Sequence, residues 1–352
     1  MNVSHFPLTP HDHQLIVLKR LLGSFPVVRF MNWQQINRSQ WDKRPLVRTW
    51  RDLPQIDTEW RYKAGPWGSW QGVPLREIIR VANALGVRPW ICIPDTAGDT
   101  LIRRMVASVI KQAKHRPIIE FSNEIWNTNF MQHHYAVEQG ADSGKKPFQA
   151  ALYWQASQTR KLAAAAQGAA DVVVCGQFFN EWVVQQLLEE CGDVVSALGV
   201  APYLGRHQRA IETVNGVWRM RSMPTLAEEV SAEIDTDITQ RFQSFKRLAD
   251  RYNIELFAYE GGLHQAARND HGRGAFEMEK IGFARFNRSI MGGNATYQLW
   301  KTWRENGGTV ACPYSLSTIF KQQKSFFGHC ELHDNEIRML PKYLSARQAL
   351  QA

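Results

Sequence analysis

Two glutamates have the residue type and the setting that could break a glycosidic bond. Glu124 closes the segment IIEFSNE, and Glu260 closes the segment FAYE much further along the chain. Retaining glycoside hydrolysis uses two carboxyl groups about 5–5.5 Å apart: one attacks the anomeric carbon, and the other protonates the leaving oxygen and then activates water. We therefore expect the carboxyl groups of Glu124 and Glu260 to lie within about 4.5–6 Å of each other.

Both segments belong to an alternation of short strands and longer helices. β-Branched and aromatic runs predict seven strands, over residues 26–33, 90–94, 118–124, 172–176, 197–203, 255–260 and 296–300. Helical patterns lie between them, near residues 75–86, 98–115, 148–168, 178–191, 225–252 and 275–291. This alternation predicts an α/β protein with a parallel sheet, whose functional groups lie at the C-terminal ends of the strands.

The chain shows no repeat and no Pro/Ser-rich linker, so we expect residues 1–352 to form one barrel domain. Within it we expect three accessory segments. They are a helical lead-in over residues 1–24, a long Trp-rich loop over residues 34–74 and a C-terminal extension over residues 304–352 that packs on the barrel.

The predicted strand ends resemble those of clan A glycoside hydrolases, in particular family 5-like members with a (β/α)8 TIM barrel. IIEFSNEIWN resembles their strand-4 acid/base motif, FAYEGG their strand-7 nucleophile motif and VVRFMNW their strand-2 segment; APY and QLW resemble strands 6 and 8. In more detail, RFMNW, PWICIPD, EFSNEIWN, APYLG and YEGGLH, in that order, resemble a little-characterised bacterial group described as cellulases or cellulose-binding proteins. The resemblance covers residues 25–300.

This resemblance implies a role for each matching residue. Glu124 would be the acid/base, Glu260 the nucleophile and Asn123 a contact for the sugar 2-hydroxyl. Arg29 and Tyr203 would orient Glu260, and Trp300 would stack on the sugar ring. The further candidate substrate contacts are Asn32, Trp33, Trp126 and His264, although His264 could equally be a surface-loop histidine. Family 5 enzymes usually have a histidine two residues before the strand-6 tyrosine, and this chain has Ala201 there.

The electrostatic expectations concern Arg29 and the two glutamates. Strand parity places Glu120 on the same side as Glu124, and a buried carboxylate there needs a cationic partner. Arg29 can therefore pair with Glu120, with Glu260 or with both. A general acid must be protonated while its neighbour is ionised, so we expect a raised pKa for Glu124 and an ionised Glu260 held by Arg29 or Tyr203.

The tryptophans also indicate sugar recognition. Six of the 13 tryptophans fall between Trp33 and Trp70, among asparagine, aspartate and arginine residues. Flat rings suit sugar C–H groups and polar side chains suit hydroxyls, whereas a small folded core beneath the loop would use some of the same rings. The expectation is that at least two of a named set face the glutamates: Trp33, Trp41, Trp67, Trp70, Trp126 and Trp300.

Composition excludes several classes of protein. The net charge of +9 is scattered, and no nucleic-acid motif accompanies the aromatic residues, so we expect no nucleic-acid partner. No apolar run reaches about 18 residues, which argues against a membrane partner. The five cysteines show no metal-ligand spacing, and we expect neither metal nor cofactor. The sequence thus predicts a retaining O-glycoside hydrolase acting on a poly- or oligosaccharide; the alternatives are a non-catalytic carbohydrate-binding protein on the same fold and an assembly protein.

The expected barrel has one strand too few. If Arg29 lies on strand 2, a strand must precede Pro26, yet the first 25 residues contain a Pro- and His-rich stretch and then a helical pattern. We expect strand 1 to be missing because the chain begins partway into a longer product. That product would supply the strand and an export signal; as written, the chain has no signal peptide and would be cytoplasmic. Alternatively, residues 15–18 or the first residues pair in that place.

Overall fold

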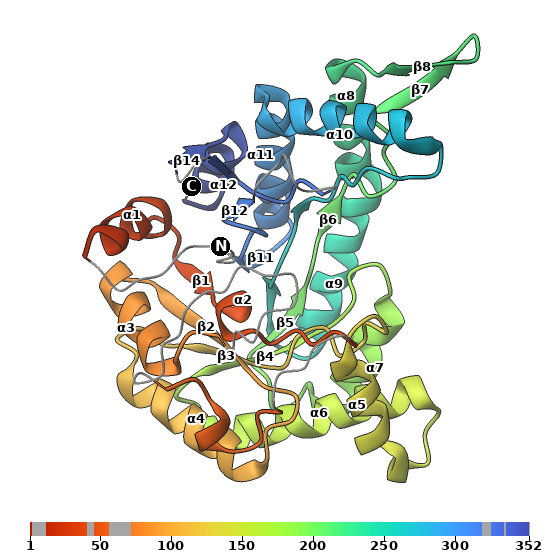
Figure 1. Cartoon of the computed structure of the whole chain (residues 1–352). Helices are drawn as coiled ribbons and strands as arrows, with labels where there is room; N and C mark the ends of the chain where they lie inside the picture. The colour runs from red at the N-terminus through yellow and green to blue at the C-terminus, as the bar shows by residue number, and fades with distance from the viewer. Residues whose placement is uncertain (2–11, 41–45, 56–71, 319–324, 334–335, 352) are drawn as a thin grey trace.

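The structure, a computed structural model, describes residues 1, 12–40, 46–55, 72–318, 325–333 and 336–351 (Figure 1). Its centre is a sheet of seven strands, all parallel to their neighbours. In sheet order these strands are β1 (Val27–Arg29), β2 (Arg88–Ile93), β3 (Ile118–Phe121), β4 (Asp171–Cys175), β5 (Ala197–Val200), β9 (Glu255–Ala258) and β11 (Gly308–Ala311). Among the described residues, the sheet is a nearly closed α/β barrel with seven of the eight strands of a TIM barrel, as the sequence predicts.

Helices surround the barrel on its outer side (Figure 1). The helices of the first half are α1 (Asp12–Leu22), α2 (Met31–Gln34), α3 (Leu75–Leu85), α4 (Asp99–Gln112), α5 (Met131–Gln139), α6 (Pro147–Ala166) and α7 (Glu181–Cys191). Those of the second half are α8 (Met223–Glu233), α9 (Thr239–Arg251), α10 (Gly272–Arg288), α11 (Ile290–Glu305) and α12 (Pro341–Gln351). A π-helical turn over Ile234–Ile238 joins α8 to α9. The predicted helix over residues 225–252 is therefore two α-helices linked by this turn.

The short elements lie outside the main sheet. They are the 3-10 turns Trp50–Asp52 and Ala141–Ser143, and strands β6 (Tyr203–Leu204), β7 (Ile211–Val214), β8 (Val217–Met220), β10 (Gly262–Leu263), β12 (Ser317–Thr318), β13 (Cys330–His333) and β14 (Glu336–Met339). β6 pairs with β10 beyond the ends of β5 and β9, and β7 with β8 forms a hairpin that projects from the body (Figure 1). The β6–β10 pair therefore joins the segment that begins at Tyr203 to the segment that follows Glu260.

Apolar side chains form an inner and an outer core. The inner core fills the barrel and includes Trp90, Cys92, Cys175 and Phe257. The outer core lies between the strands and the helices, where α3 contributes residues with helical spacing: Leu75, Ile78, Ile79, Ala82 and Leu85. Such spacing buries one face of a helix, and successive strand residues point to opposite sides, so one sequence supplies both cores.

The last barrel strand differs from the sequence-based expectation. Residues 296–300 lie within helix α11, and the strand is β11 instead. A short apolar run is ambiguous between a strand and a buried helix face. Here the Ser289 hydroxyl accepts from the backbone N–H of Gly292, which caps a helix whose buried residues include Thr296, Leu299 and Trp300. β11 therefore lies within the range that we expected to form a C-terminal extension.

The two outermost strands of the sheet, β1 and β11, are the edges where strand 1 is expected. Met1 lies beside β1: its amino group donates to the Val27 carbonyl at 3.0 Å, and its carbonyl accepts from Arg29 N–H at 2.9 Å. The first residue thus hydrogen-bonds to the open side of β1, but no strand pairing between Met1 and β11 is present among the described residues, and residues 15–18 lie in α1. Residues 2–11 lie outside the described part of the chain.

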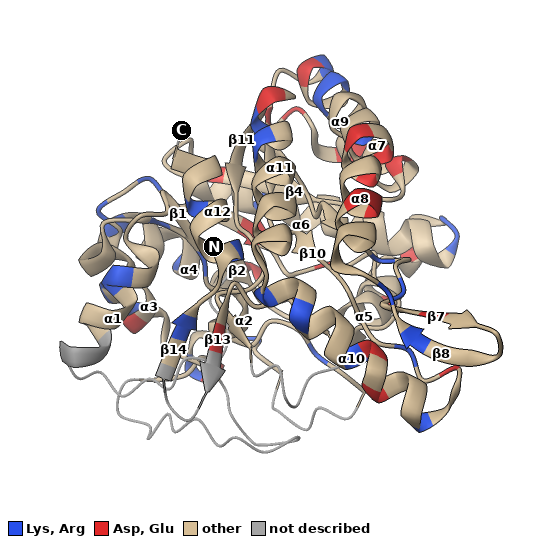
Figure 2. Ribbon diagram, turned by 90° about the horizontal axis from the view of Figure 1, so that it is seen from above, with Lys and Arg blue, Asp and Glu red and all other residues tan. Residues whose placement is uncertain are grey.

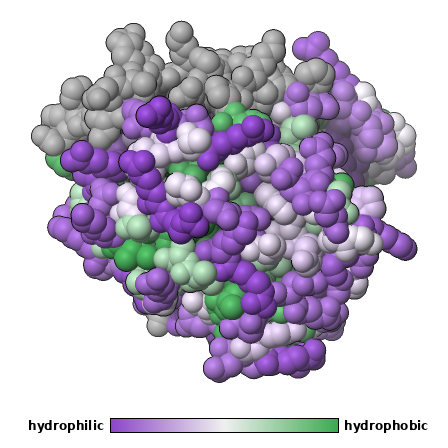
Figure 3. All heavy atoms as spheres, turned by 90° about the horizontal axis from the view of Figure 1, so that it is seen from below, coloured by the Kyte–Doolittle hydropathy of each residue, from purple (hydrophilic) through white to green (hydrophobic). Residues whose placement is uncertain are grey.

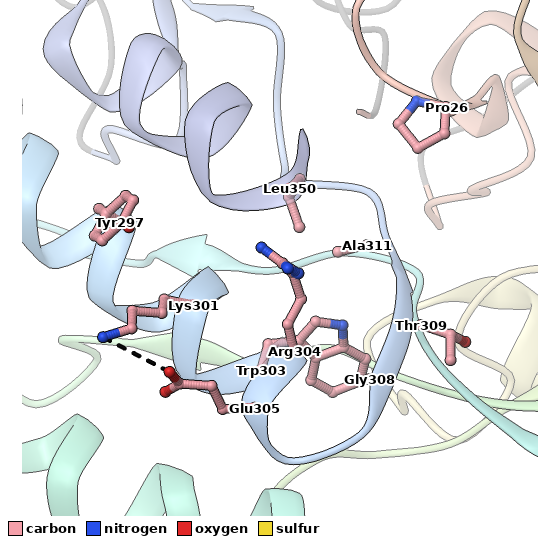
Figure 4. A pocket seen from close by; sticks show the side chains of 10 residues that line it. All are labelled: Pro26, Tyr297, Lys301, Trp303, Arg304, Glu305, Gly308, Thr309, Ala311 and Leu350. Atoms are coloured by element: carbon pink, nitrogen blue, oxygen red, sulfur yellow. Dashed lines mark ion pairs between the residues drawn. The ribbon is translucent and has the colours of Figure 1, made fainter. Parts of the chain in front are cut away.

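A pocket of about 540 Å³ lies near these edges, at the N-terminal end of the barrel strands. Figure 4 shows Pro26, Gly308 and Thr309 around it, with Lys301 and Arg304 from α11. Neither Glu124 nor Glu260 lines it, because both follow the C-terminal ends of their strands. This pocket is therefore separate from the predicted catalytic residues.

The charged side chains are dispersed. Figure 2 shows basic and acidic residues interspersed along the outer helices, and the face in Figure 3 is mostly hydrophilic with small, separate apolar patches. Of the helices that the structure describes, none has both the length and the apolar content needed to cross a bilayer.

The first prediction tests the packing inside the barrel. A Cβ on Gly199 in β5 would lie 2.4 Å from the Cys175 sulfur, so Gly199→Ala overpacks the inner core and should lower the free energy of unfolding by about 1–3 kcal/mol. Gly274→Ala is the matched control: this helical glycine has open space around its Cβ position, and alanine should stabilise by up to about 1 kcal/mol. Urea denaturation measures both, and equal effects would refute the packing assignment.

Candidate active site

Arg29, the last residue of β1, is the centre of the site. Its side chain is fully buried, and its guanidinium donates in three directions. Nε and Nη2 donate to Glu120 Oε2 at 3.1 and 2.7 Å, and Nη1 donates to Glu260 Oε1 at 2.9 Å. Nη2 also donates to Asn123 Oδ1 at 2.7 Å. Burial alone would lower the pKa of Arg29, but the charges of Glu120 and Glu260 raise it well above its ordinary value.

Glu120 lies on β3 and supports Arg29 from inside the barrel. Trp90 Nε1 donates to the same Glu120 oxygen at 2.9 Å, and the Cys92 thiol lies 3.5 Å from it. Burial raises the pKa of Cys92 well above its usual value, so this thiol stays protonated. The two pairings expected for Arg29 therefore coexist: Glu120 fixes one side of the guanidinium and Glu260 occupies the other.

Glu260 follows β9 and accepts from two strong donors. Besides the bond from Arg29 to Oε1, the Tyr203 hydroxyl donates to Oε2 at 2.7 Å. Burial raises the pKa of Glu260, whereas the Arg29 charge and the Tyr203 hydroxyl oppose that rise because they stabilise the carboxylate. After Glu260 the chain turns at Gly261, whose φ is 151° and whose Cβ would lie 2.9 Å from the Pro202 carbonyl oxygen. Only glycine fits this close approach.

Glu124 follows β3 in an unusual backbone conformation. Its φ is 45° and that of Ser122 is 58°, so the turn places two non-glycine residues in the left-handed region. Such conformations cost of order 1 kcal/mol or more each and cluster at functional sites. In this position Glu124 Oε1 accepts from the Tyr259 hydroxyl at 3.1 Å and Oε2 accepts from Asn127 Nδ2 at 2.9 Å.

The protonation of Glu124 differs from that of an ordinary glutamate. Burial, and next the charge of Glu260, raise its pKa from 4.5 to about 7, while Asn127 and Tyr259 act in the opposite direction. The charge of Glu260 thus acts on Glu124, and the expected separation of about 4.5–6 Å between the two carboxyl groups stays a prediction. This direction agrees with the expectation for Glu124, whereas the pKa of Glu260, which we expected to be the ionised member, is raised as well. The two glutamates differ in their hydrogen-bond donors: Arg29, a cation, donates to Glu260, whereas the donors to Glu124 among the described residues are the neutral Asn127 and Tyr259.

Aromatic residues surround the Glu260 side of the site. The ring of His264 lies 5.2 Å from that of Tyr203 and 4.7 Å from that of Phe327. Tyr314, three residues after β11, lies 5.4 Å from Phe327, and its hydroxyl accepts from Asn32 Nδ2 at 3.4 Å. Burial lowers the pKa of His264 to about 4 and raises that of Tyr314 to about 12. All of these rings are therefore uncharged near neutral pH.

A polar network holds Asn123 beside Arg29. Asn123 Nδ2 donates to Asn37 Oδ1 at 2.8 Å, and Gln132 Nε2 donates to the same oxygen at 2.9 Å. Gln132 also donates to the Asn123 carbonyl at 3.1 Å and accepts from the backbone N–H of Arg38 at 3.0 Å. The Asn123 amide thus links the arginine to the loop after α2.

Two tryptophans expected to face the site are buried elsewhere. Trp300 is in α11, where it packs behind Gly261 and is inaccessible to solvent, because the expected strand is a helix. Trp33 is also buried, with its ring 5.3 Å from that of Phe30. Trp126 is half-buried and packs against the outer core. The others, Trp41, Trp67 and Trp70, lie outside the described residues. The structure provides Tyr314 as the aromatic residue after the last barrel strand.

Sequence reasoning missed four residues of the site: Asn127, Tyr259, Tyr314 and Phe327. Tyr259 immediately precedes Glu260, so its position was visible in the sequence but its contact with Glu124 was not. A correct placement of the last strand at GTVA would have drawn attention to Tyr314. Among the described residues, no group of three or more His, Cys, Asp or Glu side chains has an arrangement suited to a metal ion.

Comparison with known proteins identifies the fold. No protein-family model and no curated protein sequence matches the chain. Solved structures do match. They include an α-L-arabinofuranosidase from Thermotoga maritima (13% identity, 96% of this chain and 62% of that chain, TM-score 0.57) and a family 51 α-L-arabinofuranosidase from Bifidobacterium longum (12%, 99% and 71%, 0.58). A broad-specificity family 5 endoglucanase from Clostridium cellulovorans also matches (11%, 97% and 87%, 0.51).

The chain spans a little over 60% of the length of the first three arabinofuranosidases that it matches. At 11–14% identity the likeness establishes the fold, and the expected relation to the cellulase-like bacterial group has no support from sequence comparison. The chain therefore shares the barrel fold of these glycoside hydrolases, and Glu124 and Glu260 lie beyond the C-terminal ends of its third and sixth strands.

The second prediction follows from the raised pKa of Glu124. Folded protein holds a proton on Glu124 between pH 4.5 and about 7 and unfolded protein does not, so this group's contribution to stability is lost as the pH rises through 7. Glutamine at position 124 cannot ionise, so the variant does not lose this contribution. The difference in unfolding free energy, Glu124→Gln minus wild type, should therefore rise by on the order of 2–3 kcal/mol between pH 4.5 and pH 7.5. Urea denaturation at both pH values measures this difference. The exposed Glu138→Gln is the control, and a pH-independent difference for Glu124→Gln would contradict the assignment.

Proposed function

We propose that the protein is a retaining O-glycoside hydrolase that acts on a poly- or oligosaccharide. The observation that supports this most is the contrast between its two neighbouring glutamates. Arg29 and Tyr203 contact Glu260 and favour its carboxylate, whereas burial and the nearby Glu260 favour a protonated Glu124. Two carboxyl groups whose surroundings separate their protonation states are what double displacement requires.

In the first half of the reaction, Glu260 attacks and Glu124 gives up its proton. A carboxylate oxygen of Glu260 forms a bond to the anomeric carbon while the bond from that carbon to the leaving oxygen breaks. The electron pair of the broken bond stays on the leaving oxygen, which takes the proton from Glu124. Arg29 and Tyr203 hold the Glu260 carboxylate in one orientation throughout, so little reorganisation accompanies the attack.

In the second half, Glu124 is an anion and acts as a base. It removes a proton from water as the water oxygen bonds to the anomeric carbon, and the bond to Glu260 breaks with its electron pair returning to the carboxylate. Glu124 is then protonated and Glu260 ionised, as at the start. Two inversions leave the anomeric configuration retained.

The surroundings of Glu260 supply the expected sugar contacts in place of Trp300. Tyr314, Phe327 and His264 form an uncharged aromatic cluster beside Tyr203. Rings of this kind pack against sugar C–H groups, and hydroxyl and imidazole groups bond to sugar hydroxyls. The Asn123 amide and Asn32, which donates to the Tyr314 hydroxyl, are the further candidate contacts.

The third prediction tests the two roles with a panel of aryl glycosides and polysaccharides. Glu124→Gln should lose about 10²–10⁴-fold in kcat on substrates with poor leaving groups, and much less on dinitrophenyl glycosides, because only poor leaving groups need the proton in the first step. Glu260→Gln should lose activity on both kinds, because it removes the attacking carboxylate. Glu138→Gln, on the exposed face of α5, should retain wild-type activity.

Proton NMR of the first-formed sugar should show the anomer of the substrate. Release of the opposite anomer would overturn the retaining mechanism. The alternative is a non-catalytic carbohydrate-binding protein on this fold. It would be supported if the wild-type protein binds polysaccharide, cleaves no member of the panel, and binds equally well after either glutamate is replaced by glutamine.

A further inference from the structure

We propose that Tyr259 is a positioning residue that joins the two glutamates into one assembly, with its ring against the Arg29 guanidinium and its hydroxyl on Glu124 Oε1. The roles of the glutamates as acid/base and nucleophile rest on the proposed function. The contacts of Tyr259 do not, so they can be tested separately. Tyr259 is not among the residues that the sequence resemblance implicates.

The position of Tyr259 is set by the barrel itself. Its backbone N–H donates to the Val200 carbonyl at 3.1 Å, which extends the pairing of β9 with β5 by one residue. The side chain is fully buried within the inner core. A Cβ on Gly199 of the neighbouring strand would lie 3.4 Å from the Tyr259 ring. The absence of a side chain at Gly199 therefore provides space for this ring.

From this position Tyr259 contacts both halves of the site. The Arg29 guanidinium carbon lies 5.1 Å from the centre of the Tyr259 ring, within the range of a cation–π contact. The same guanidinium donates to Glu260 Oε1, and the Tyr259 hydroxyl donates to Glu124 Oε1 at 3.1 Å. A single rigid side chain therefore spans the distance from the arginine that orients one glutamate to the carboxyl group of the other.

The hydroxyl also affects the proton of Glu124. A donor to a carboxyl oxygen stabilises the anion, and Glu124 becomes an anion once it has protonated a leaving group. Asn127 does the same at the other oxygen. Together they oppose burial and Glu260, and they keep Glu124 acidic enough to release its proton. Within the described part of the chain, the charged and titratable groups around Glu124 and Glu260 are Arg29, Cys92, Glu120, Tyr203, Tyr259 and Tyr314.

The competing explanation is that Tyr259 only fills space in the inner core. The two explanations differ for Tyr259→Phe, which keeps the ring and its contact with Arg29 and removes only the hydroxyl. Space filling predicts no change in the titration of Glu124. Positioning through the hydroxyl predicts that the pKa of Glu124 rises, because one stabilising donor to its anion is lost.

The fourth prediction is tested by ¹³C NMR titration of protein labelled at the glutamate carboxyl carbons, with the Glu124 signal assigned by its absence in Glu124→Gln. Tyr259→Phe should raise the titration midpoint of Glu124 by about one pH unit, the equivalent of one hydrogen bond. Tyr203→Phe is the matched control: it removes a tyrosine hydroxyl from Glu260, and should move the Glu260 signal far more than the Glu124 signal. This measurement needs no substrate.

If the protein hydrolyses glycosides, the pH profile provides an independent readout. Glu124 must be protonated and Glu260 ionised for the first step. Tyr259→Phe should therefore shift the alkaline limb of kcat/KM upward by about one pH unit, and Tyr203→Phe should shift the acidic limb upward. Tyr259→Leu also removes the ring from Arg29, and should shift both limbs and lower the melting temperature.

Each result decides between the explanations. An unchanged Glu124 midpoint in Tyr259→Phe, or equal shifts of Glu124 in Tyr259→Phe and Tyr203→Phe, overturns the proposal. A shifted midpoint in a protein that cleaves no glycoside supports the positioning contact and removes the proposed function alone. If Tyr259→Phe fails to fold, 4-aminophenylalanine at position 259, which retains a weaker N–H donor on an unchanged ring, should give a smaller shift in the same direction; no shift would overturn the proposal.

Discussion

The arrangement of this site depends on one buried cation. Arg29 has no contact with solvent, and its guanidinium is shared between Glu120 and Glu260. Removing one partner from such a buried pair costs about 3–5 kcal/mol, because the charge left behind has no water to stabilise it. Glu120 therefore does more than neutralise Arg29: it accepts from Nε and Nη2, while Nη1 donates to Glu260. The orientation of Glu260 follows from this geometry.

The surplus of negative charge explains the behaviour of Glu124. Three carboxyl groups and one guanidinium lie within the same region, and one arginine cannot balance three anions. Burial and the charge of Glu260 then make ionisation of Glu124 unfavourable up to a pH near its pKa of about 7. The same balance leaves Tyr203 and Tyr259 as neutral donors, since burial raises the pKa of both hydroxyls well above their usual values. In the proposed mechanism, the direct contact with Arg29 is what favours the carboxylate of Glu260 over that of Glu124.

The barrel positions these groups at one end, and no eighth strand joins β1 to β11 within the described part of the chain. Strands β1, β3 and β9 bring Arg29, Glu120 and Glu260 together, although these residues are far apart in the chain. Met1 bonds two backbone groups of β1, the Val27 carbonyl and the Arg29 N–H, and a separate pocket lies at the opposite end of the strands. The helices α11 and α12 complete the structure on that side, where Trp303 and Leu350 line the pocket.

The sequence by itself determined the alternation of strands and helices, six of the seven strands and the two glutamates, because hydrophobic periodicity and strand-end residues are local properties. It also indicated Arg29, Glu120 and Tyr203. It could not place the last strand, because Thr296 to Trp300 suits a strand or a buried helix face equally, and only packing against the barrel selects the helix. The contacts of Tyr259 and Tyr314 were likewise decided by the tertiary structure, since closure of the barrel sets which distant strand ends meet.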